Sequence, residues 1–387
     1  MNWYNKTMTF FKKYIVLGAF FILSCLPPAQ AQEANIAGQL SGWLTVTDDE
    51  SQLGLRYIPE LSLSQQLSPA YEISGEFAAN LRWWSDYADW DYTDDTLTVD
   101  PYRLWMRFAA PQYEIRAGLQ KISFGSATLL RPLMWFDTLD PRDPLQLTEG
   151  VYGLLGRYFF QNNANIWLWA LTGNDDQKGW ELLPTDKWSI EYGGRIQLPS
   201  FTGEIGFSYD HRTADSSTVP AYTAEPATDT FTEDRFALDG KWDVGVGLWF
   251  ESALMRQDLE TLELAYQRLV TIGMDYTFSL GNGLHLLAEH FDSTMAEHAF
   301  DAGENYTISA FSADYPVGIL DTLMSIVYYN WQDEAWSSFL SWQRSYDQWS
   351  LNVNFFSNPD EPLLDRDNSL TSGFAGRGVQ CLLVFNH

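Results

Sequence analysis

Cysteine, histidine and basic residues are scarce in this sequence. It has 2 Cys, 5 His and 23 Lys and Arg against 51 Asp and Glu, which gives a formal net charge of −28. Cys25 lies in an N-terminal segment that we predict to be removed, so Cys381 has no partner for an intramolecular disulfide. A surface this acidic argues against nucleic acid as a partner. The few histidines form no group of metal ligands, and we expect no metal site and no cofactor.

Long apolar runs are also missing, apart from one near the N-terminus. A lysine-containing stretch, an apolar run (14–26) and a small-x-small sequence (29–31) follow one another. This is the pattern of a cleaved export signal, and the run is shorter than the roughly 20 residues of a spanning helix. Lipidation at Cys25 is the alternative, but Cys25 lacks a good lipobox before it. We predict an export signal over residues 1–31 and one β-barrel domain over residues 32–387.

Aromatic residues are abundant, with 17 Trp, 20 Tyr and 24 Phe. Trp and Tyr are typical of the two interfaces of a membrane barrel. From residue 35 onward, segments of about ten residues alternate in polarity, as barrel strands do. In 71–83, charged and polar residues occupy one face and apolar residues the other, so the charged face must line a wet interior. The pattern predicts an all-β fold, a transmembrane antiparallel β-barrel.

Short and long connections alternate between these segments. The short ones are rich in Gly, Pro, Asn and Asp, which suits tight periplasmic hairpins. The long ones are richer in acidic residues and are expected outside the cell; examples are 86–100, 173–187, 212–233 and 359–372. Counting between connections predicts about 18 strands. Sixteen is the alternative, because 233–258 and 306–331 are hard to divide.

One connection, residues 126–150, differs from the others. It carries three prolines (Pro132, Pro141, Pro144) and many Leu, Met, Trp and Phe residues. Proline prevents a continuous helix, and so much apolar surface is not left in water. Loops of this length are usually functional. We predict that it folds into the barrel as a constriction loop.

Several short sequences around this loop resemble those of a known group of proteins. They are the strand 116–120, the pair Phe124-Gly125, the triplet 130–132 and the segment 140–144. Together they resemble alginate-export-type and related porin-like outer-membrane barrels. The resemblance implies a pore, either for diffusion of small solutes or for export of a polysaccharide. The acidity of this chain does not suit a polyanion such as alginate.

Charge is unevenly distributed along the chain. Arg103 and Arg107 share one strand face, and with Arg82 and Arg116 on neighbouring strands they predict a basic strip on the lumen wall. Residues 271–343 contain no Lys or Arg and ten acidic residues, which predicts an acidic arc opposite. Such opposed charges filter ions. The candidate constriction residues are Arg82, Arg103, Arg107, Arg116, Arg131, Asp137, Asp140, Arg142, Asp143, Glu149 and Arg157.

Two interpretations of the loop charges stay open. The loop acids can face the arginines as a selectivity filter, or Arg131 and Arg142 can pair with them and hold the loop in shape. Signs of catalysis are weak. Asp210-His211 has none of the partners that an outer-membrane hydrolase needs, and His285 and Glu289 lack a third ligand. We therefore expect no enzymatic activity.

These observations predict a passive channel for small hydrophilic solutes in the outer membrane of a Gram-negative bacterium. An export conduit for a polysaccharide or other secreted product is the alternative, and a rim-active enzyme or adhesin is a third candidate. The expected partners are outer-membrane lipid, lipopolysaccharide, the transported solutes and, during biogenesis, the barrel-assembly machinery. A homotrimer is possible, but no stretch of the sequence marks a trimer face.

Overall fold

The computed structural model describes residues 32–48, 50–217, 230–258, 264–359 and 374–387, so the predicted export signal over 1–31 lies outside the described residues. The described chain is all-β. Its strands are β1 (Gln32–Thr47), β2 (Glu50–Ser68), β3 (Tyr71–Ala88), β4 (Asp91–Ala109), β5 (Tyr113–Gln120), β6 (Val151–Phe159), β7 (Asn165–Leu171), β8 (Glu191–Ser200), β9 (Gly203–Asp215), β10 (Thr230–Asp243), β11 (Gly247–Asp258), β12 (Tyr266–Phe278), β13 (Leu284–Ala296), β14 (Glu304–Pro316), β15 (Asp321–Asn330), β16 (Ala335–Ser345), β17 (Trp349–Ser357) and β18 (Arg377–Asn386).

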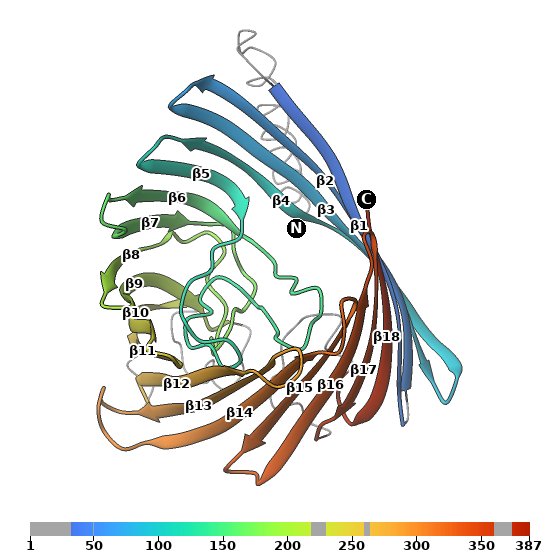
Figure 1. Ribbon diagram of the computed structural model, residues 1–387. Coiled ribbons are helices and arrows are strands. Elements are labelled where there is room, and N and C mark those ends of the chain that lie inside the picture. Colours follow the sequence, from blue (N-terminus) through green and yellow to red (C-terminus); the bar gives the residue numbers. More distant parts are fainter. Residues whose placement is uncertain (1–31, 49, 218–229, 259–263, 360–373) are drawn as a thin grey trace.

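The strands form one closed antiparallel barrel of 18 strands (Figure 1). Each strand pairs with its neighbours in sequence, and β1 pairs with both β2 and β18, which closes the ring. The predicted barrel is confirmed, and the alternative of 16 strands is wrong. Both segments that were hard to divide from sequence, 233–258 and 306–331, contain two strands joined by a tight turn.

The predicted long loop over residues 86–100 is wrong. β3 and β4 continue through this region and are joined by a two-residue turn, Asp89-Trp90, with positive φ angles of 51° and 68°. Positive φ at both central residues is the geometry that matches the twist of paired strands. Acidic residues do not interrupt the strands because this end of the hairpin is exposed to water. The acidic composition of residues 86–100 therefore indicates exposure to water and does not indicate a loop.

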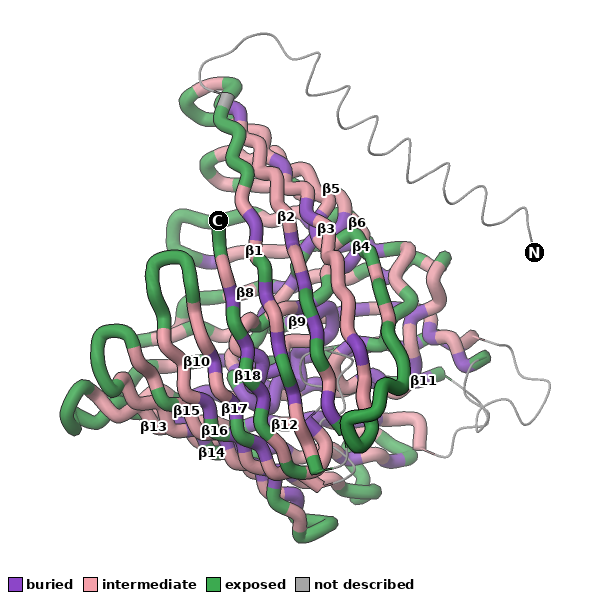
Figure 2. Tube along the Cα trace, turned by 90° about the vertical axis from the view of Figure 1, so that its right-hand side faces the viewer, coloured by how far each residue is buried: buried purple, intermediate pink, exposed green. Residues whose placement is uncertain are grey.

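Side chains alternate between the two faces of the wall, which Figure 2 shows as alternating buried and exposed residues along β1 and β2. The outer face carries exposed apolar side chains, among them Leu40, Leu55 and Leu383. The inner face of the neighbouring strands carries Ser41, Arg56 and other polar residues. An apolar outside with a polar inside suits a barrel in lipid. In the described part of the chain, no helix has the length and apolar character to cross a membrane.

The largest apolar core lies inside the barrel. It joins residues 122–136, together with Trp169 and Leu171 of β7, to the inner wall from β10 to β17. Figure 1 shows the connection between β5 and β6 running through the interior of the ring of strands. The predicted in-folded loop is confirmed, and it packs on one side of the lumen.

We expect a charge on the outer face to destabilise the barrel. Leu340 points outward from the middle of β16 and is 45% exposed. Replacing it by Arg should cost about 2–4 kcal/mol near the bilayer midplane, because the charge is forced into hydrocarbon. Unfolding of the protein from lipid vesicles by guanidinium measures the loss. Leu340→Met is the control and should change the unfolding free energy little; equal stability of the two variants would contradict an outward position in lipid.

Candidate functional site in the barrel lumen

The constriction loop, residues 126–150, follows the inner wall of the barrel from β10 around to β4. It contacts Glu289 on β13 through backbone hydrogen bonds. Further along, Leu145 packs beside Trp43 of β1, and the carbonyl of Thr148 accepts a hydrogen bond from Arg103 of β4 at 2.9 Å. The loop is therefore held at several points around the lumen, so its position is set by the whole barrel.

Two carboxylates of the wall hold the first part of this loop. Glu251 on β11 and Glu289 on β13 are 0% and 3% exposed, and each accepts hydrogen bonds from loop backbone N–H groups. Glu251 accepts from Ala127 at 2.7 Å and Leu133 at 3.1 Å. Glu289 accepts from Thr128, Leu129 and Leu130 at 2.7, 2.9 and 2.6 Å. Each side chain therefore pairs with two or three backbone N–H groups of the loop, and we describe these two residues as the loop anchors.

Neutral side chains complete the attachment. The Trp249 indole donates to Glu289 at 2.9 Å, and the Thr271 hydroxyl donates to the carbonyl of Leu130 at 2.6 Å. The long connection predicted outside the cell over 173–187 instead contacts the constriction loop and the inner wall, because Trp180 stacks on Phe291, and we describe residues 172–190 as the second in-folded segment. The Trp180 indole donates to the carbonyl of Arg131 at 2.9 Å. Polar groups of this buried stretch of backbone are thus paired with the wall, as buried backbone requires.

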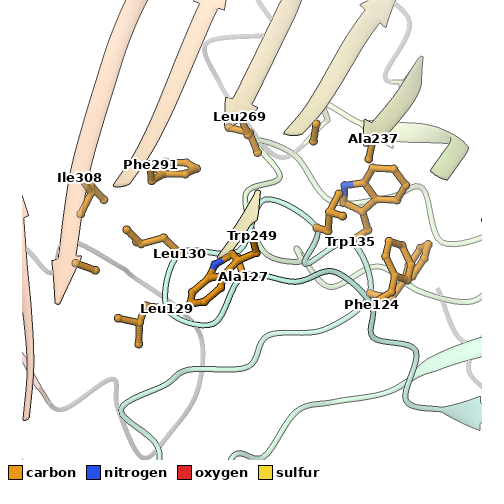
Figure 3. Close-up of a cluster of buried hydrophobic side chains, with 14 of the residues drawn as sticks. Phe124, Ala127, Leu129, Leu130, Trp135, Ala237, Trp249, Leu269, Phe291 and Ile308 are labelled. Carbon is orange, nitrogen blue, oxygen red and sulfur yellow. The ribbon is translucent and has the colours of Figure 1, made fainter. Parts of the chain in front are cut away.

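An apolar surface lies beside the anchors. Figure 3 shows Leu129 and Leu130 of the loop near Phe291 and Ile308 of the wall, and Trp135 near Ala237. These side chains are at most 3% exposed. Burying Leu or Phe contributes roughly 1.5–3 kcal/mol per side chain, so packing adds substantially to the anchoring.

The loop acids are used within the loop. Asp137 pairs with Arg131 at 2.9 Å and Asp140 with Arg142 at 2.7 Å. Asp143 accepts hydrogen bonds from the backbone N–H groups of Leu145 and Leu147 at 2.9 and 3.0 Å. All three aspartates are 1% exposed. Burial opposes the charge of Arg142, and the attraction of Asp140 outweighs it and raises the Arg142 pKa. The geometry is that of charges which hold the loop in shape.

Two charged groups beside this segment remain open to solvent. The Glu149 side chain is 64% exposed and lies 3.5 Å from the ammonium of Lys178. Lys121, at the end of β5, is exposed in part, and partial burial lowers its pKa. Among the candidate acids of the loop, Glu149 alone therefore presents its charge to the lumen.

The second in-folded segment is held by a buried ionic network that sequence reasoning did not find. Glu181 of this segment lies 2.7 Å from Arg235 and 3.4 Å from Arg212. Glu233 bonds both arginines, at 2.8 Å to Arg212 and 2.7 Å to Arg235. All four side chains are at most 3% exposed. Asp210, also buried, lies 4.0 Å from Arg235, so each of the two buried arginines is paired with more than one acid.

The predicted basic strip lies on the wall formed by β2 to β6. Arg82, Arg103, Arg107, Arg116 and Arg157 are on inward positions of neighbouring strands, and Arg107 stands directly opposite Arg116 in the β4–β5 ladder. Arg56, which sequence reasoning did not include, stands opposite Arg82 in the β2–β3 ladder. The alternation of polar and apolar residues along this strand indicates an inward position for Arg56.

These arginines differ in how they are neutralised. Arg107 pairs with Glu72 at 2.7 Å, and Arg157 pairs with Glu114 at 3.2 Å. Arg82, Arg103 and Arg116 form no ion pair with any described residue. Each stacks on an aromatic ring instead: Arg82 on Trp84 at 4.7 Å, Arg103 on Tyr102 at 3.9 Å and Arg116 on Trp105 at 4.4 Å. Stacking holds a guanidinium in place and leaves its charge uncompensated.

The predicted acidic arc contributes less to the lumen than its composition implied. Of its acids, Glu289 is covered by the constriction loop, and Asp292 points outward between the inward Phe291 and its neighbours. Asp275 and Asp314 face inward and flank His285 at 3.5 and 3.7 Å. The sequence shows how many acidic residues this region contains, but it does not show which of them the constriction loop covers.

Other candidate residues do not form a joint site. Asp210 points inward and accepts from Trp169 at 2.8 Å, whereas His211 points outward to Asp234 at 2.8 Å. Trp167 also points inward, with Arg157 3.8 Å from its ring, so Trp167 and Trp169 both face the interior of the barrel. No group of three or more His, Cys, Asp or Glu able to hold a metal occurs among the described residues.

A scan against protein-family models and a search of curated proteins find no match to this sequence. Solved outer-membrane barrels resemble its fold. OccAB4 of Acinetobacter baumannii has a TM-score of 0.55 at 8% identity, over 93% of this chain and 98% of that one. OpdQ of Pseudomonas aeruginosa has 0.54 at 9%, over 92% and 98%. OmpT, an outer-membrane protein of Vibrio cholerae in a trimer form, has 0.51 at 10%, over 92% and 99%. Such identities show a shared fold, and the alginate-export-type resemblance is not confirmed.

We expect the loop anchors to set the position of the constriction loop. Glu251→Gln with Glu289→Gln keeps the side-chain shape but removes the charge, at about 1–3 kcal/mol for each disturbed anchor. The loop should become accessible, so trypsin should cleave after Arg131 or Arg142 and single-channel current noise should increase. Glu304→Gln, at an exposed position of β14, is the control. A protease-resistant loop in the double variant would contradict the anchoring.

We also expect the ionic network to stabilise the second in-folded segment. Arg235→Met leaves Glu181 and Glu233 with one arginine between them and should destabilise the fold by about 3–5 kcal/mol. The temperature at which the folded band disappears in unheated gels measures the loss. Arg268→Gln, on the outer face, serves as the control. An unchanged transition in Arg235→Met would refute the role of the network.

Proposed function

We propose that this chain is an outer-membrane channel through which small hydrophilic solutes diffuse passively, with anions favoured. The observation that carries the proposal is the charge balance at the constriction. Arg82, Arg103 and Arg116 are without ion pairs among the described residues, while Asp137 and Asp140 pair with arginines of the loop itself and Asp143 accepts hydrogen bonds from the loop backbone. We infer a net positive field at this level, because these three arginines outnumber the inward acids Glu60 and Glu76 of the same wall, although the chain as a whole carries a charge of −28.

Paired positions of the strip support a functional role. Like charges directly opposite each other on neighbouring strands are destabilising. Arg56 opposite Arg82 and Arg107 opposite Arg116 are two such pairs. Arg107 is compensated by Glu72, whereas Arg82 and Arg116 each stand opposite another arginine and form no ion pair with a described residue. A wall that attracts anions gains from keeping them together.

The position of the constriction loop supports a narrow passage. The anchors and the apolar core hold it against the wall from β10 to β17, and Leu145 and Thr148 bring it back to β1 and β4. In a narrow wet gap with low-dielectric walls, unpaired charges act strongly on passing ions. Opposed charges orient dipolar solutes, and here the open Glu149 lies on the loop side.

We also propose that this channel lies in the outer membrane of a Gram-negative bacterium. Its outward apolar face needs outer-membrane lipid and lipopolysaccharide around it, and insertion of such a barrel requires the assembly machinery of a Gram-negative outer membrane. A homotrimer is a candidate assembly, because the Vibrio cholerae OmpT structure is described in a trimer form. The mass of the detergent-solubilised protein distinguishes a trimer from a monomer. We propose no catalytic activity for this chain.

An export conduit for an anionic polysaccharide is the second candidate. The observation in its favour is the same unpaired arginine strip, which a polyuronate would also contact. The anchored loop argues for small solutes, because a polymer needs a passage that stays open along its whole length. If polyuronate oligomers added from the periplasmic side block the current and appear on the other side, the conduit is favoured over a small-solute channel.

We expect anion preference to depend on the unpaired arginines. In a planar bilayer under a salt gradient, the reversal potential of the wild type should have the sign of anion selectivity. Arg82→Gln with Arg116→Gln should lower the ratio of anion to cation permeability about sevenfold per charge, because a unit charge about 7 Å away in water stabilises an anion and destabilises a cation by about 0.6 kcal/mol each.

Arg344→Gln is the matched control, since this arginine lies on the outer face and pairs with Asp321 at 3.6 Å. It should leave the reversal potential unchanged. Cation selectivity of the wild type would overturn the proposed preference, and absence of conductance both in the wild type and after deletion of residues 129–147 would overturn the channel itself.

A further inference from the structure

The outer face of the barrel carries a groove that neither the channel nor the core explains. It crosses β11 to β16 with a cavity volume of about 800 Å³. Its outward lining residues are mostly apolar or aromatic, among them Ile272, Met274, Phe311, Tyr329 and Trp336. Small side chains, among them Ala288, form the floor. The surface faces the hydrocarbon of the bilayer, so the groove has the dimensions and polarity to accept an acyl chain.

Polar groups lie inside this apolar groove. His290 Nδ1 is 2.9 Å from the Ser309 hydroxyl, which also accepts a hydrogen bond from the Trp331 indole at 2.9 Å. His290 is exposed, and its Nε2 has no hydrogen bond with any described residue. Polar atoms in contact with hydrocarbon are costly unless they find partners. The ester, amide or hydroxyl groups near the head of a lipid acyl chain supply such partners.

Two arginines stand on the same outer face, toward the extracellular ends of the strands. Arg256 lies between the inward Met255 and Gln257 near the end of β11, and Arg268 follows the inward Gln267 near the start of β12. Arg268 is four residues, about 13 Å, along β12 from the groove residue Ile272. Arg256 stands opposite Asp234 in the β10–β11 ladder, and Arg268 donates hydrogen bonds to the Thr294 hydroxyl at 3.2 Å and to the carbonyl of Ala299 at 3.4 Å. Neither guanidinium forms an ion pair within 4.0 Å with a described residue, so two basic groups at the level of lipid headgroups remain available to an anionic ligand.

We propose that this face binds one phosphorylated glycolipid of the outer leaflet. An acyl chain occupies the groove, its polar linkage meets His290, and a headgroup phosphate contacts Arg256 and Arg268. The apolar groove facing hydrocarbon, the polar groups inside it and the two arginines beyond it together match a ligand with an acyl chain and an anionic headgroup. A basic residue near an anionic membrane surface contributes about 1 kcal/mol, which is about fivefold in affinity. The site depends on placement in the outer membrane and is independent of conduction.

Native mass spectrometry of the detergent-solubilised full protein, titrated with diphosphorylated lipid A, tests the proposal. The wild type should bind one molecule, and Arg256→Gln with Arg268→Gln should weaken binding about 25-fold, from two arginines at about fivefold each. Ala288→Trp fills the groove and should abolish binding. Arg344→Gln, the outward arginine paired with Asp321, should bind as the wild type does. Conductance of each variant in a planar bilayer shows that it is folded and separates this proposal from the channel function.

Three further ligands test whether binding depends on the phosphate groups and on the lipid A structure. Lipid A without its phosphates should bind as weakly as the intact lipid binds the double arginine variant, and inorganic phosphate should not displace the lipid. Dimyristoyl phosphatidylcholine should not compete. Equal affinity of the wild type for both forms of lipid A, or equal affinity of all variants for the intact form, would overturn the site. A change of subunit number in Ala288→Trp with lipid binding retained would show that the groove is a subunit interface and would also overturn it.

Discussion

Two buried carboxylates determine how the interior of this barrel is arranged. Glu251 and Glu289 point from the wall into the constriction loop, and together they accept hydrogen bonds from five of its backbone N–H groups. A buried charge without partners is very costly, so these acids and this loop backbone need each other. Once the loop is held there, its apolar side chains cover the wall from β10 to β17, and the arginine wall of β2 to β6 remains the open charged surface of the lumen.

Much of the fold could be predicted because alternation and turn composition are local signals. The strand number, the short turns and the in-folded loop followed from patterns a few residues long. The hairpin at Asp89-Trp90 is not predictable in this way, because acidic composition is the same in an exposed loop and in strands that extend into water. A β-turn there needs only two residues with positive φ, and strands that leave the membrane tolerate acids on both faces.

The site was less predictable because partners lie far apart in sequence. The arginine strip was found because strand neighbours are neighbours in the chain. The anchors were missed because Thr128 and Glu289 are 161 residues apart. One local signal did exist: the inward face of β11 carries Trp249, Ala253 and Met255 beside Glu251, an apolar row in a lumen expected to be wet. Such a row indicates that another part of the chain covers it.

The long sequence separation between the loop and its anchors has a consequence for the order of folding. The constriction loop is synthesised before β10 to β18, yet its contacts are with β11, β13, β18 and β1. It can reach its final position only when the later strands curve round to enclose it. Loop docking and closure of the β1–β18 seam are therefore late and coupled events. A chain arrested before β13 would expose an apolar loop and unmatched N–H groups, and periplasmic chaperones bind such surfaces.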